Sequence, residues 1–322
     1  MKIFFLCPDF PRPSGGTKTL YWYVAQLRKQ GLNACIVHQK SGFKLTWHGI
    51  DAPTISLADH PELNLDDIIV FTEVMHSLMQ QFQSTPVCKV VLALNWGSHY
   101  IKLEAEDNWK NYGISKVFTP APIISNYIQW RMKLPCTVID CFLDPKVYFD
   151  NKKSKLKKIS YMSRKTVDGE ILRSTFTKHP KHTDFEWQAL KNFSEKDYAK
   201  HLQQSAIYLP LYPEEGLNIS VLEAMACGCL VVGYSGVGGS DYMIGKGEKQ
   251  NCILVENGNL PAFGTILDEI LSQWSNNPAS FQMIIDQAIQ TASRFQNKEK
   301  EAKQLGDFFK SLPTNIGKNI IQ

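Results

Sequence analysis

The sequence lacks the features that mark membrane, exported and tandem-repeat proteins. No apolar run approaches the roughly 18 residues that a membrane-spanning helix needs. The apolar stretch that opens the chain ends before Asp9, so it is too short for a signal-peptide core and predicts a buried strand. The sequence also contains no internal repeat and no low-complexity tract. We therefore expect a cytoplasmic globular protein.

The sequence also lacks CxxC cysteine pairs and has only a small net charge. None of the 8 cysteines forms a CxxC pair, and the nearest pairs are Cys227 with Cys229 and Cys136 with Cys141. In a chain of 322 residues this predicts reduced, buried thiols instead of a disulfide framework or a zinc site. The 35 Lys and Arg nearly balance the 31 Asp and Glu, giving a net charge of +4. So small an excess gives no reason to expect a nucleic acid partner.

Short apolar stretches alternate with helical periodicity along the whole chain. With 43% apolar residues, the length suits about two domains. The pattern predicts a helix at 220–226, a helical tail from 278 onward, and strands at 2–7, 34–37, 68–71, 89–94, 116–119, 137–139, 159–162, 206–210, 230–233 and 252–255. Alternating strands and helices indicate an α/β fold with parallel sheets. We predict two Rossmann-like, doubly wound domains that face each other across a cleft, with ligands bound beyond the carboxyl ends of the strands.

A polar, lysine-rich run at 150–158 is the best candidate for a domain linker. It predicts an N-terminal domain at 1–150 and a C-terminal domain at 151–300. The amphipathic residues at 301–322 then form a helix that either crosses back to the N-terminal domain or packs on its own domain. The lysines also suit a peripheral contact with anionic lipid, although a solvated linker is the favoured explanation.

The most informative segment is 208–233. A strand leads into a loop that carries Glu215 and Gly216, and a helix with Glu223 follows. The two acids are eight positions apart, about two helical turns, so both can line one side of a cleft. Free amides at the helix start would face an anion or sugar hydroxyls. As an alternative, Glu215 simply complements the helix dipole. Glu223 has apolar neighbours, so its carboxylate needs a partner, which favours a functional role.

Other candidates also follow predicted strands. Gly15 and Gly16 come after the first strand and would expose amides, although an ordinary turn would look the same. His99 and Glu73 follow two further strands, and each has a structural role as its alternative. The basic pair Arg164 and Lys165 follows the strand at 159–162, where it either binds an anion or extends the basic linker.

Together these motifs resemble the retaining, GT4-type glycosyltransferases of group 1, which have the GT-B fold. The spacing of Glu215 and Glu223, with Ala-Met-Ala-Cys-Gly behind it, is similar to the family's E-x7-E signature. Weaker similarities follow in the expected order and cover most of the chain: the glycine-rich donor loop at 13–17, the end of the N-terminal domain at 142–149, the first strand of the C-terminal domain at 161–165 and the glycine-rich loop at 230–242.

The resemblance implies a role for each matching residue on the nucleotide-sugar donor. Glu223 would bind the ribose hydroxyls and Glu215 the hydroxyls of the donor sugar. Backbone amides of the donor loop and of the loop before the helix would meet sugar and phosphate: Gly15, Gly16, Gly216, Leu217 and Asn218. Arg164 and Lys165 would neutralise the departing diphosphate, because preorganised cations lower the barrier to its departure. His99 would lie near the donor sugar and the acceptor.

The resemblance also implies a metal-independent transfer without a cofactor. No Asp-x-Asp motif is present to hold a metal. The expected reaction moves a hexose-type sugar to a hydroxyl of a saccharide or lipid-linked acceptor, in surface polysaccharide or glycan biosynthesis. The chain departs from the family at Asn218, where glycine is common, and at Arg164 and Lys165, which the family usually separates. It is also short for the family, which indicates trimmed acceptor-side loops.

Two alternative functions remain open at this point. One is another GT-B enzyme, such as a nucleotide-sugar epimerase or a phosphorylase, although the E-x7-E block argues against both. The other is a catalytically silent subunit that binds a sugar nucleotide and acts as a scaffold. The sequence does not name the base, the sugar, the acceptor, the linkage or the oligomeric state.

Overall fold

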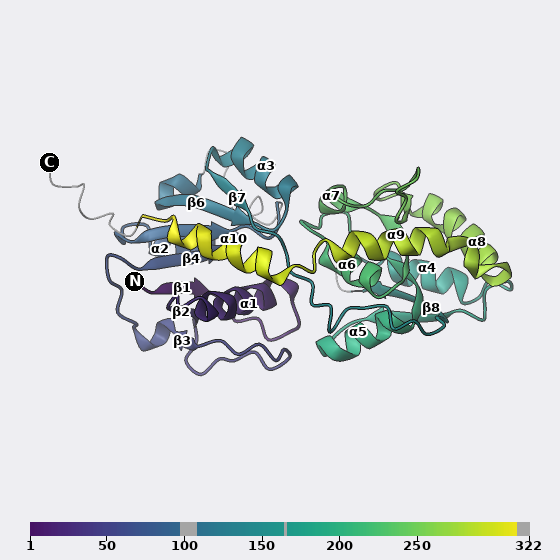
Figure 1. Ribbon diagram of the computed structural model, residues 1–322, viewed down its shortest axis with the longest axis horizontal. Coiled ribbons are helices and arrows are strands. Elements are labelled where there is room, and N and C mark those ends of the chain that lie inside the picture. Colours follow the sequence, from purple (N-terminus) through teal and green to yellow (C-terminus); the bar gives the residue numbers. More distant parts are fainter. Residues whose placement is uncertain (97–107, 164–165, 314–322) are drawn as a thin grey trace. The chain divides into compact units, whose positions relative to one another are not determined.

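The chain divides into two compact units in the structure, a computed structural model that describes residues 1–96, 108–163 and 166–313. Unit 1 consists of Met1–Cys141 and the C-terminal segment that begins at Glu299, and unit 2 of Phe142–Lys298. Each unit contains one parallel β-sheet with helices packed on it (Figure 1). The two sheets confirm the predicted α/β class with Rossmann-like domains.

Unit 1 contains a seven-stranded sheet in the order β3-β2-β1-β4-β5-β6-β7, in which every neighbouring pair is parallel. Its strands are β1 (Ile3–Leu6), β2 (Ala34–His38), β3 (Thr54–Ser56), β4 (Ile68–Thr72), β5 (Cys88–Leu92), β6 (Ile114–Thr119) and β7 (Cys136–Val138). The helices are α1 (Gly15–Lys29), α2 (His76–Gln81), α3 (Pro122–Met132) and α10 (Lys298–Lys310), with short 3-10 turns η1 (Leu57–Asp59) and η2 (Trp109–Tyr112).

Unit 2 contains a five-stranded parallel sheet in the order β12-β11-β10-β8-β9. Its strands are β8 (Leu156–Met162), β9 (Glu186–Leu190), β10 (Ser205–Leu209), β11 (Leu230–Tyr234) and β12 (Ile253–Val255). The helices are α4 (Asp168–Phe176), α5 (Glu195–Gln204), α6 (Ile219–Ala226), α7 (Gly236–Gly239), α8 (Leu260–Asn276) and α9 (Gln282–Ser293), with the 3-10 turn η3 (Pro278–Phe281).

The central strands are buried along their whole length and are mainly apolar, although β5 contains Lys89. Every residue of β1, β4, β5, β10 and β11 is buried. A strand covered on both faces gains from apolar side chains at every position, so it shows a continuous run and not an alternating pattern. This is why the ten strands predicted from apolar runs all appear in the structure, within a few residues of their expected ends.

Two strands were missed for a related reason. The strand β3 has only three residues, and β9 contains Glu186 and Gln188 among its five. Both strands lie at the edge of their sheet. A strand at the edge of a sheet can be short or partly polar without destabilising the sheet. Such a strand therefore has no long apolar run, which is the pattern on which the prediction depended.

Each sheet reverses its strand order at one point. In unit 1 the chain leaves β1 toward β2 and β3, and returns on the other side of β1 with β4. In unit 2 it goes from β8 to β9 on one side and returns with β10 on the other. Open α/β sheets bind ligands outside the carboxyl ends of the strands at such reversal points. The loops that follow β1, β4, β8 and β10 are therefore the places to look for a site.

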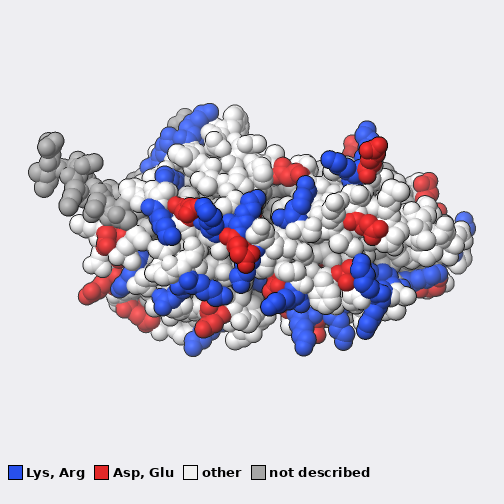
Figure 2. Space-filling view, viewed as in Figure 1, with Lys and Arg blue, Asp and Glu red and all other residues white. Residues whose placement is uncertain are grey.

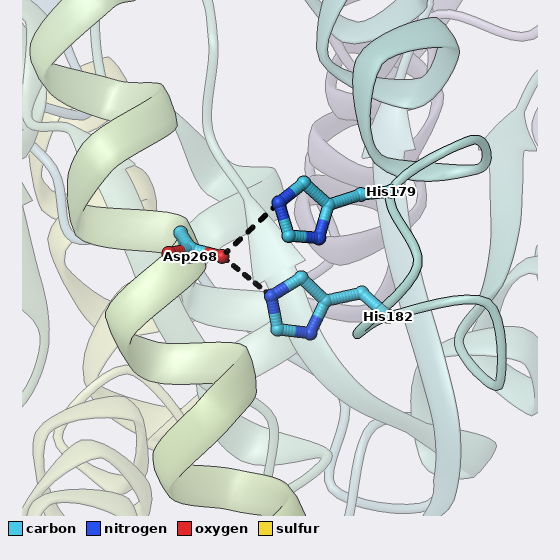
Figure 3. A group of neighbouring side chains, drawn as sticks. All are labelled: His179, His182 and Asp268. Carbon is cyan, nitrogen blue, oxygen red and sulfur yellow. Dashed lines mark hydrogen bonds and ion pairs between the residues drawn. The ribbon is translucent and has the colours of Figure 1, made fainter.

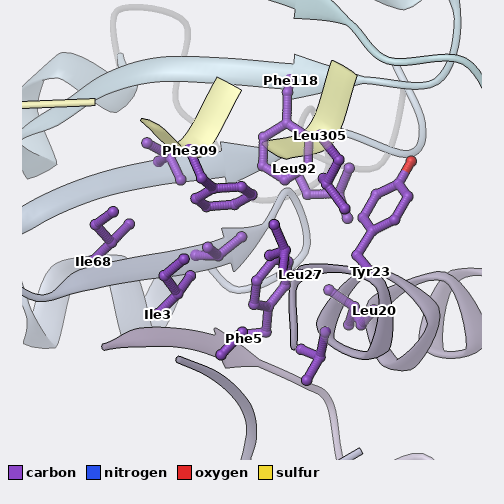
Figure 4. Packing of buried hydrophobic residues seen from close by; sticks show 14 of the residues in the cluster. Ile3, Phe5, Leu20, Tyr23, Leu27, Ile68, Leu92, Phe118, Leu305 and Phe309 are labelled. Carbon is purple, nitrogen blue, oxygen red and sulfur yellow. The ribbon is translucent and has the colours of Figure 1, made fainter. Parts of the chain in front are cut away.

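The helix α10 belongs to the core of unit 1, although it follows unit 2 in the sequence (Figures 1 and 4). The ring of Phe309 is fully buried, with its centroid 5.5 Å from that of Phe5 and 5.7 Å from that of Phe118. Close by, the indole Nε1 of Trp22 donates a hydrogen bond of 2.6 Å to Glu301 Oε2. The C-terminal helix is thus a structural part of the N-terminal unit.

The division between the units differs from the predicted boundary at residue 150. It falls after Cys141, because the next segment bonds to unit 2. The Leu143 N–H donates to Phe295 O at 2.8 Å, and Gln203 Nε2 donates to Val147 O at 3.2 Å. The polar run at 150–158 therefore lies inside unit 2 and leads into β8, so it is not the linker that its composition suggested.

Side-chain chemistry on the surface and in the core agrees with the composition. On the face of each unit that Figure 2 shows, basic and acidic side chains are interspersed. All 8 cysteines are free thiols, as the spacing predicted. Among the residues that the structure describes, no helix is both long and apolar enough to cross a bilayer.

Candidate functional site

The loop after β10 carries Glu215, and the helix α6 that follows this loop carries Glu223. Tyr208, on β10, is 1% exposed, and Glu223 and Glu215 both lie within electrostatic range of its hydroxyl. Burial, followed by the charges of these two carboxylates, raises the pKa of the Tyr208 phenol, while a hydrogen bond with Ser220 opposes the shift. The structure therefore brings Glu215 and Glu223 together around one buried phenol, at the reversal point between β8 and β10.

Glu223 faces two further phenols. Burial is the main cause that raises the pKa of Tyr148 and of Tyr198, and the charge of Glu223 is the next. Tyr148 lies in the segment 142–149 and Tyr198 on α5, so both belong to unit 2. The Glu223 side chain is half-buried. Its carboxylate has the polar neighbours that an acid among apolar residues requires.

The loop after β10 rests directly on the glycine-rich turn after β11. The Gly238 N–H donates to Glu215 O at 3.0 Å, and the Val237 N–H donates to Pro213 O at 2.9 Å. A Cβ at Gly238 would lie 1.8 Å from the carbonyl oxygen of Gly216, far inside van der Waals contact. Only glycine fits at this position, because backbone meets backbone without a side chain between them.

The start of α6 is fixed by a second set of contacts. The Tyr242 hydroxyl donates to Leu217 O at 3.1 Å and to Asn218 O at 2.9 Å. Asn218 is the N-cap residue, with a left-handed backbone at φ 56° and ψ 54°. Asparagine tolerates this conformation better than most residues, because its side chain bonds locally. Here the Ser220 hydroxyl donates to Asn218 Oδ1 at 2.9 Å. The backbone thus explains why asparagine can stand where the resembling family has glycine.

In unit 1 the predicted donor loop opens a helix. Gly15 is the first residue of α1, and the helix has no acidic residue in its first turn. The side chain of the N-cap residue, Ser14, makes no capping hydrogen bond. The first amides of a helix have no partner inside it and attract an anion. A Cβ at Gly16 would lie 3.1 Å from Leu94 Cδ1, so the residue after β5 packs tightly against this turn.

Glu73 connects the ends of β4 and β5. It is 6% exposed, directly follows β4, and accepts a hydrogen bond of 3.1 Å from the Leu94 N–H. Burial raises the pKa of Glu73 from its usual 4.5 to about 7, and backbone hydrogen bonds from Leu94, Glu73 itself and Asn95 oppose the shift. The sequence placed this acid at a strand end. Its burial and its hold on Leu94 became visible only in the structure.

The predicted site residues therefore form two groups and a remainder. Unit 2 brings together Glu215, Gly216, Leu217, Asn218 and Glu223, and unit 1 brings together Gly15 and Gly16. His99, Arg164 and Lys165 lie outside the described residues. In the sequence, the basic pair falls in the connection between β8 and α4, and His99 falls after β5.

The contact between the two loops of unit 2 predicts the effect of one methyl group. We expect Gly238→Ala to destabilise unit 2 by about 2–3 kcal/mol, because the new Cβ must push the Glu215 loop away. Hydrogen–deuterium exchange should become faster in peptides that cover 210–219. The matched control is Gly264→Ala on α8, where a Cβ would meet nothing within 4 Å. Equal exchange in the two variants would contradict the close contact.

The environment of Glu73 predicts a pH dependence of stability. A carboxyl with a raised pKa in the folded state contributes stability at pH values below 4.5, and this is lost as the pH rises through about 7. Glu73→Gln keeps an acceptor for the Leu94 N–H and removes the titration. The melting temperature of the variant should therefore rise relative to that of the wild type between pH 5 and pH 8. The corresponding difference in the free energy of unfolding is on the order of 3 kcal/mol at most. Glu62→Gln, at an exposed position of unit 1, should show no such trend.

Comparisons with known proteins agree with this geometry. The family model described as "Glycosyl transferases group 1" matches residues 181–273, a range that includes both acids and the glycine-rich turn. A curated relative, the "Alpha-1,6-glucosyltransferase" of Actinobacillus pleuropneumoniae serotype 7 (strain AP76), is 23% identical over 249 residues. That alignment covers 73% of this chain and 73% of the relative.

Solved structures share the fold over nearly the whole chain. The sucrose-phosphate synthase of Thermosynechococcus elongatus superposes with a TM-score of 0.72 at 13% identity, over 96% of this chain and 98% of that one. Anabaena HepE in complex with UDP-glucose superposes with a TM-score of 0.69 at 15% identity, over 97% of this chain and 100% of the other. The family match, the relative and the shared fold support one interpretation: the chain is similar to the group 1 glycosyltransferases, and its two Rossmann-like domains have the GT-B fold.

Proposed function

We propose that the chain transfers a hexosyl group from a UDP-sugar to a hydroxyl acceptor with net retention, and that UDP-glucose is the donor to test first. Three observations on similar proteins support this choice. The curated relative is named as an α-1,6-glucosyltransferase. HepE is described in complex with UDP-glucose, and the pneumococcal transferase GtfA with UDP and GlcNAc. A donor and a product that are both α-linked imply retention.

The observation that carries the proposal is the pairing of Glu215 and Glu223 beside Tyr208 at the strand reversal of unit 2. We assign Glu223 to the ribose hydroxyls, since a carboxylate accepts two hydroxyl hydrogen bonds without needing a proton. Glu215 then accepts hydrogen bonds from the donor sugar. The amides of Gly216, Leu217 and Asn218 lie between the two acids in the sequence and meet sugar and phosphate.

The departing diphosphate needs positive charge or N–H donors near its oxygens. We assign this task to Arg164, Lys165 and the amides at the start of α1, because charge that develops in the transition state is best met by groups already in place. The sequence has no Asp-x-Asp motif, so we propose a metal-independent transfer. Arg164 and Lys165 follow β8, whose carboxyl end lies at the same reversal point as the Glu215 loop.

Retention is explained by attack on the face from which the diphosphate departs. The acceptor oxygen forms its bond to the anomeric carbon as the bond to the phosphate oxygen breaks, and that phosphate oxygen takes the acceptor proton. No enzymic nucleophile is required, and we assign His99 to positioning. The acceptor is a saccharide or lipid-linked hydroxyl, which places the enzyme in glycan or surface polysaccharide synthesis in the cytoplasm.

Substitution of each acid should affect a different step. We expect Glu223→Ala to weaken UDP binding about 10- to 100-fold, because hydrogen bonds to a charged group contribute about 1.5–3 kcal/mol. Glu215→Ala should leave UDP affinity nearly unchanged and lower turnover about 100-fold. Glu214→Ala changes the neighbouring exposed carboxylate and serves as the control. Calorimetry with UDP and a transfer assay measure the two effects, and unchanged UDP affinity in Glu223→Ala would refute the ribose assignment.

A donor screen tests the proposal as a whole. Thermal shifts with UDP, GDP, ADP, CMP and dTDP should single out UDP, because a bound ligand raises apparent stability by mass action. Incubation with UDP-glucose should then release UDP slowly by hydrolysis, and an accepted sugar should carry an α-linkage by NMR. Tight UDP binding without turnover across an acceptor panel would favour the scaffold alternative, and a β-linked product would exclude retention.

A further inference from the structure

Three groups with metal-ligating atoms converge on another part of unit 2. His179 and His182 lie in the segment after α4, and Asp268 lies on α8 (Figure 3). The His182 Nε2 atom is 2.6 Å from Asp268 Oδ1, and the His179 Nε2 atom is 4.0 Å from the same oxygen. The three ligand atoms lie within 4.8 Å of one another. Both imidazoles thus direct one nitrogen at a single carboxylate oxygen.

The backbone and the ring packing hold the two imidazoles in this arrangement. The His182 N–H donates to His179 O at 3.1 Å, which closes a turn and brings the two side chains to the same side. The rings stack with centroids 4.9 Å apart and planes 18° apart. Phe176 packs against both, with its centroid 6.1 Å from that of His179 and 5.8 Å from that of His182. The donors are therefore preorganised by packing.

Burial divides the three groups into one anchor and two accessible ligands. The side chain of His182 is 1% exposed, whereas those of His179 and Asp268 are 35% and 41% exposed. An apolar hollow of about 430 Å³ between α4 and α8 borders His179 and Asp268. An ion held here is accessible from solvent and has room for a water molecule as a further ligand.

Asp268 supplies the carboxylate oxygen to which both imidazoles are directed. The site then offers two imidazole nitrogens and one carboxylate oxygen. This donor set suits Zn²⁺ and related divalent ions of the first transition row, and it is a poor set for Mg²⁺ or Ca²⁺, which prefer oxygen ligands.

We propose that His179, His182 and Asp268 form a binding site for a divalent transition metal ion of the Zn²⁺ class. A tetrahedral ion with bonds near 2.1 Å separates its ligand atoms by about 3.4 Å. The contact between His182 and Asp268 must therefore lengthen, and the distance from His179 to Asp268 must shorten. Each of these two changes is under about one ångström. The two imidazole nitrogens, which lie within 4.8 Å of each other, must approach by at most about 1.4 Å. Rotations of the side chains can supply these changes.

The surroundings of the rings limit the affinity of the site. An imidazole that binds a metal through Nε2 carries its proton on Nδ1, where strong metal sites provide an acceptor. Within the part of the chain that the structure describes, neither His179 Nδ1 nor His182 Nδ1 has a hydrogen-bond partner. We therefore expect weaker binding than in structural zinc centres. The ion would clamp the segment after α4 to α8, and it plays no part in the proposed transfer.

Cobalt provides a probe that distinguishes this site from the 8 free cysteines. We expect the chelator-treated protein to bind one Co²⁺ with visible d–d bands and without a thiolate charge-transfer band, and Zn²⁺ to displace it. His179→Ala and Asp268→Asn should each lower Co²⁺ affinity at least tenfold. These two side chains are only partly buried, at 35% and 41% exposed, so the variants should fold, whereas replacement of the buried His182 threatens the core. His60→Asn, at an exposed histidine of unit 1, is the control.

The outcomes separate a metal site from a simple hydrogen-bonded pair. A rise in melting temperature on addition of Zn²⁺ that both variants lose and His60→Asn keeps would support the proposal. Absence of Co²⁺ and Zn²⁺ binding in equilibrium dialysis would overturn it, as would unchanged affinity in His179→Ala or a cobalt spectrum dominated by thiolate. UDP affinity should be equal in the wild type and the two variants, so this test is independent of the proposed function.

Discussion

The arrangement of unit 2 depends on one constraint, the direct contact of two backbone segments. The end of β11 and the turn after it approach the loop after β10 closely at three places. A Cβ at Gly233, Gly236 or Gly238 would lie 2.5, 2.8 and 1.8 Å from the carbonyl oxygens of Pro210, Pro213 and Gly216. Because no side chain separates the segments, the course of one determines the course of the other. The Gly238 N–H also binds the carbonyl of Glu215. The position of the first acid is thus set by glycines more than twenty residues later in the sequence.

The same constraint determines where the second acid lies. Once the loop is fixed, the left-handed backbone of Asn218 and its contact with Tyr242 set the direction in which α6 begins. Glu223 stands in the second turn of that helix, and its charge acts on three phenols, those of Tyr148, Tyr198 and Tyr208. Phenols offer polar contacts without introducing a charge that would neutralise the carboxylate.

Properties that depend on neighbours in the sequence were predicted well, and properties that depend on neighbours in space were not. The apolar run of β10, the following loop and the α6 helix are continuous, so the sequence alone located Glu215 and Glu223. The boundary at Cys141 depends on backbone hydrogen bonds such as that from Leu143 to Phe295, which leave no mark on composition. The raised pKa of Glu73 arises because β4 and β5 are adjacent, and the cluster of His179, His182 and Asp268 joins α8 to a loop some ninety positions earlier.

The two units each have a reversal of strand order, but the acidic groups at the two reversals have different surroundings. In unit 2 the strand reversal presents carboxylates whose neighbours are phenols. In unit 1 the reversal lies between β1 and β4, and the acid found there, Glu73, is buried and bonded to backbone N–H groups. Because Glu73 is buried, it can affect a substrate only through the residues that it contacts. It holds Leu94, whose side chain packs on Gly16 at the start of α1. Leu94 therefore connects Glu73 to the first turn of α1 through one hydrogen bond and one packing contact.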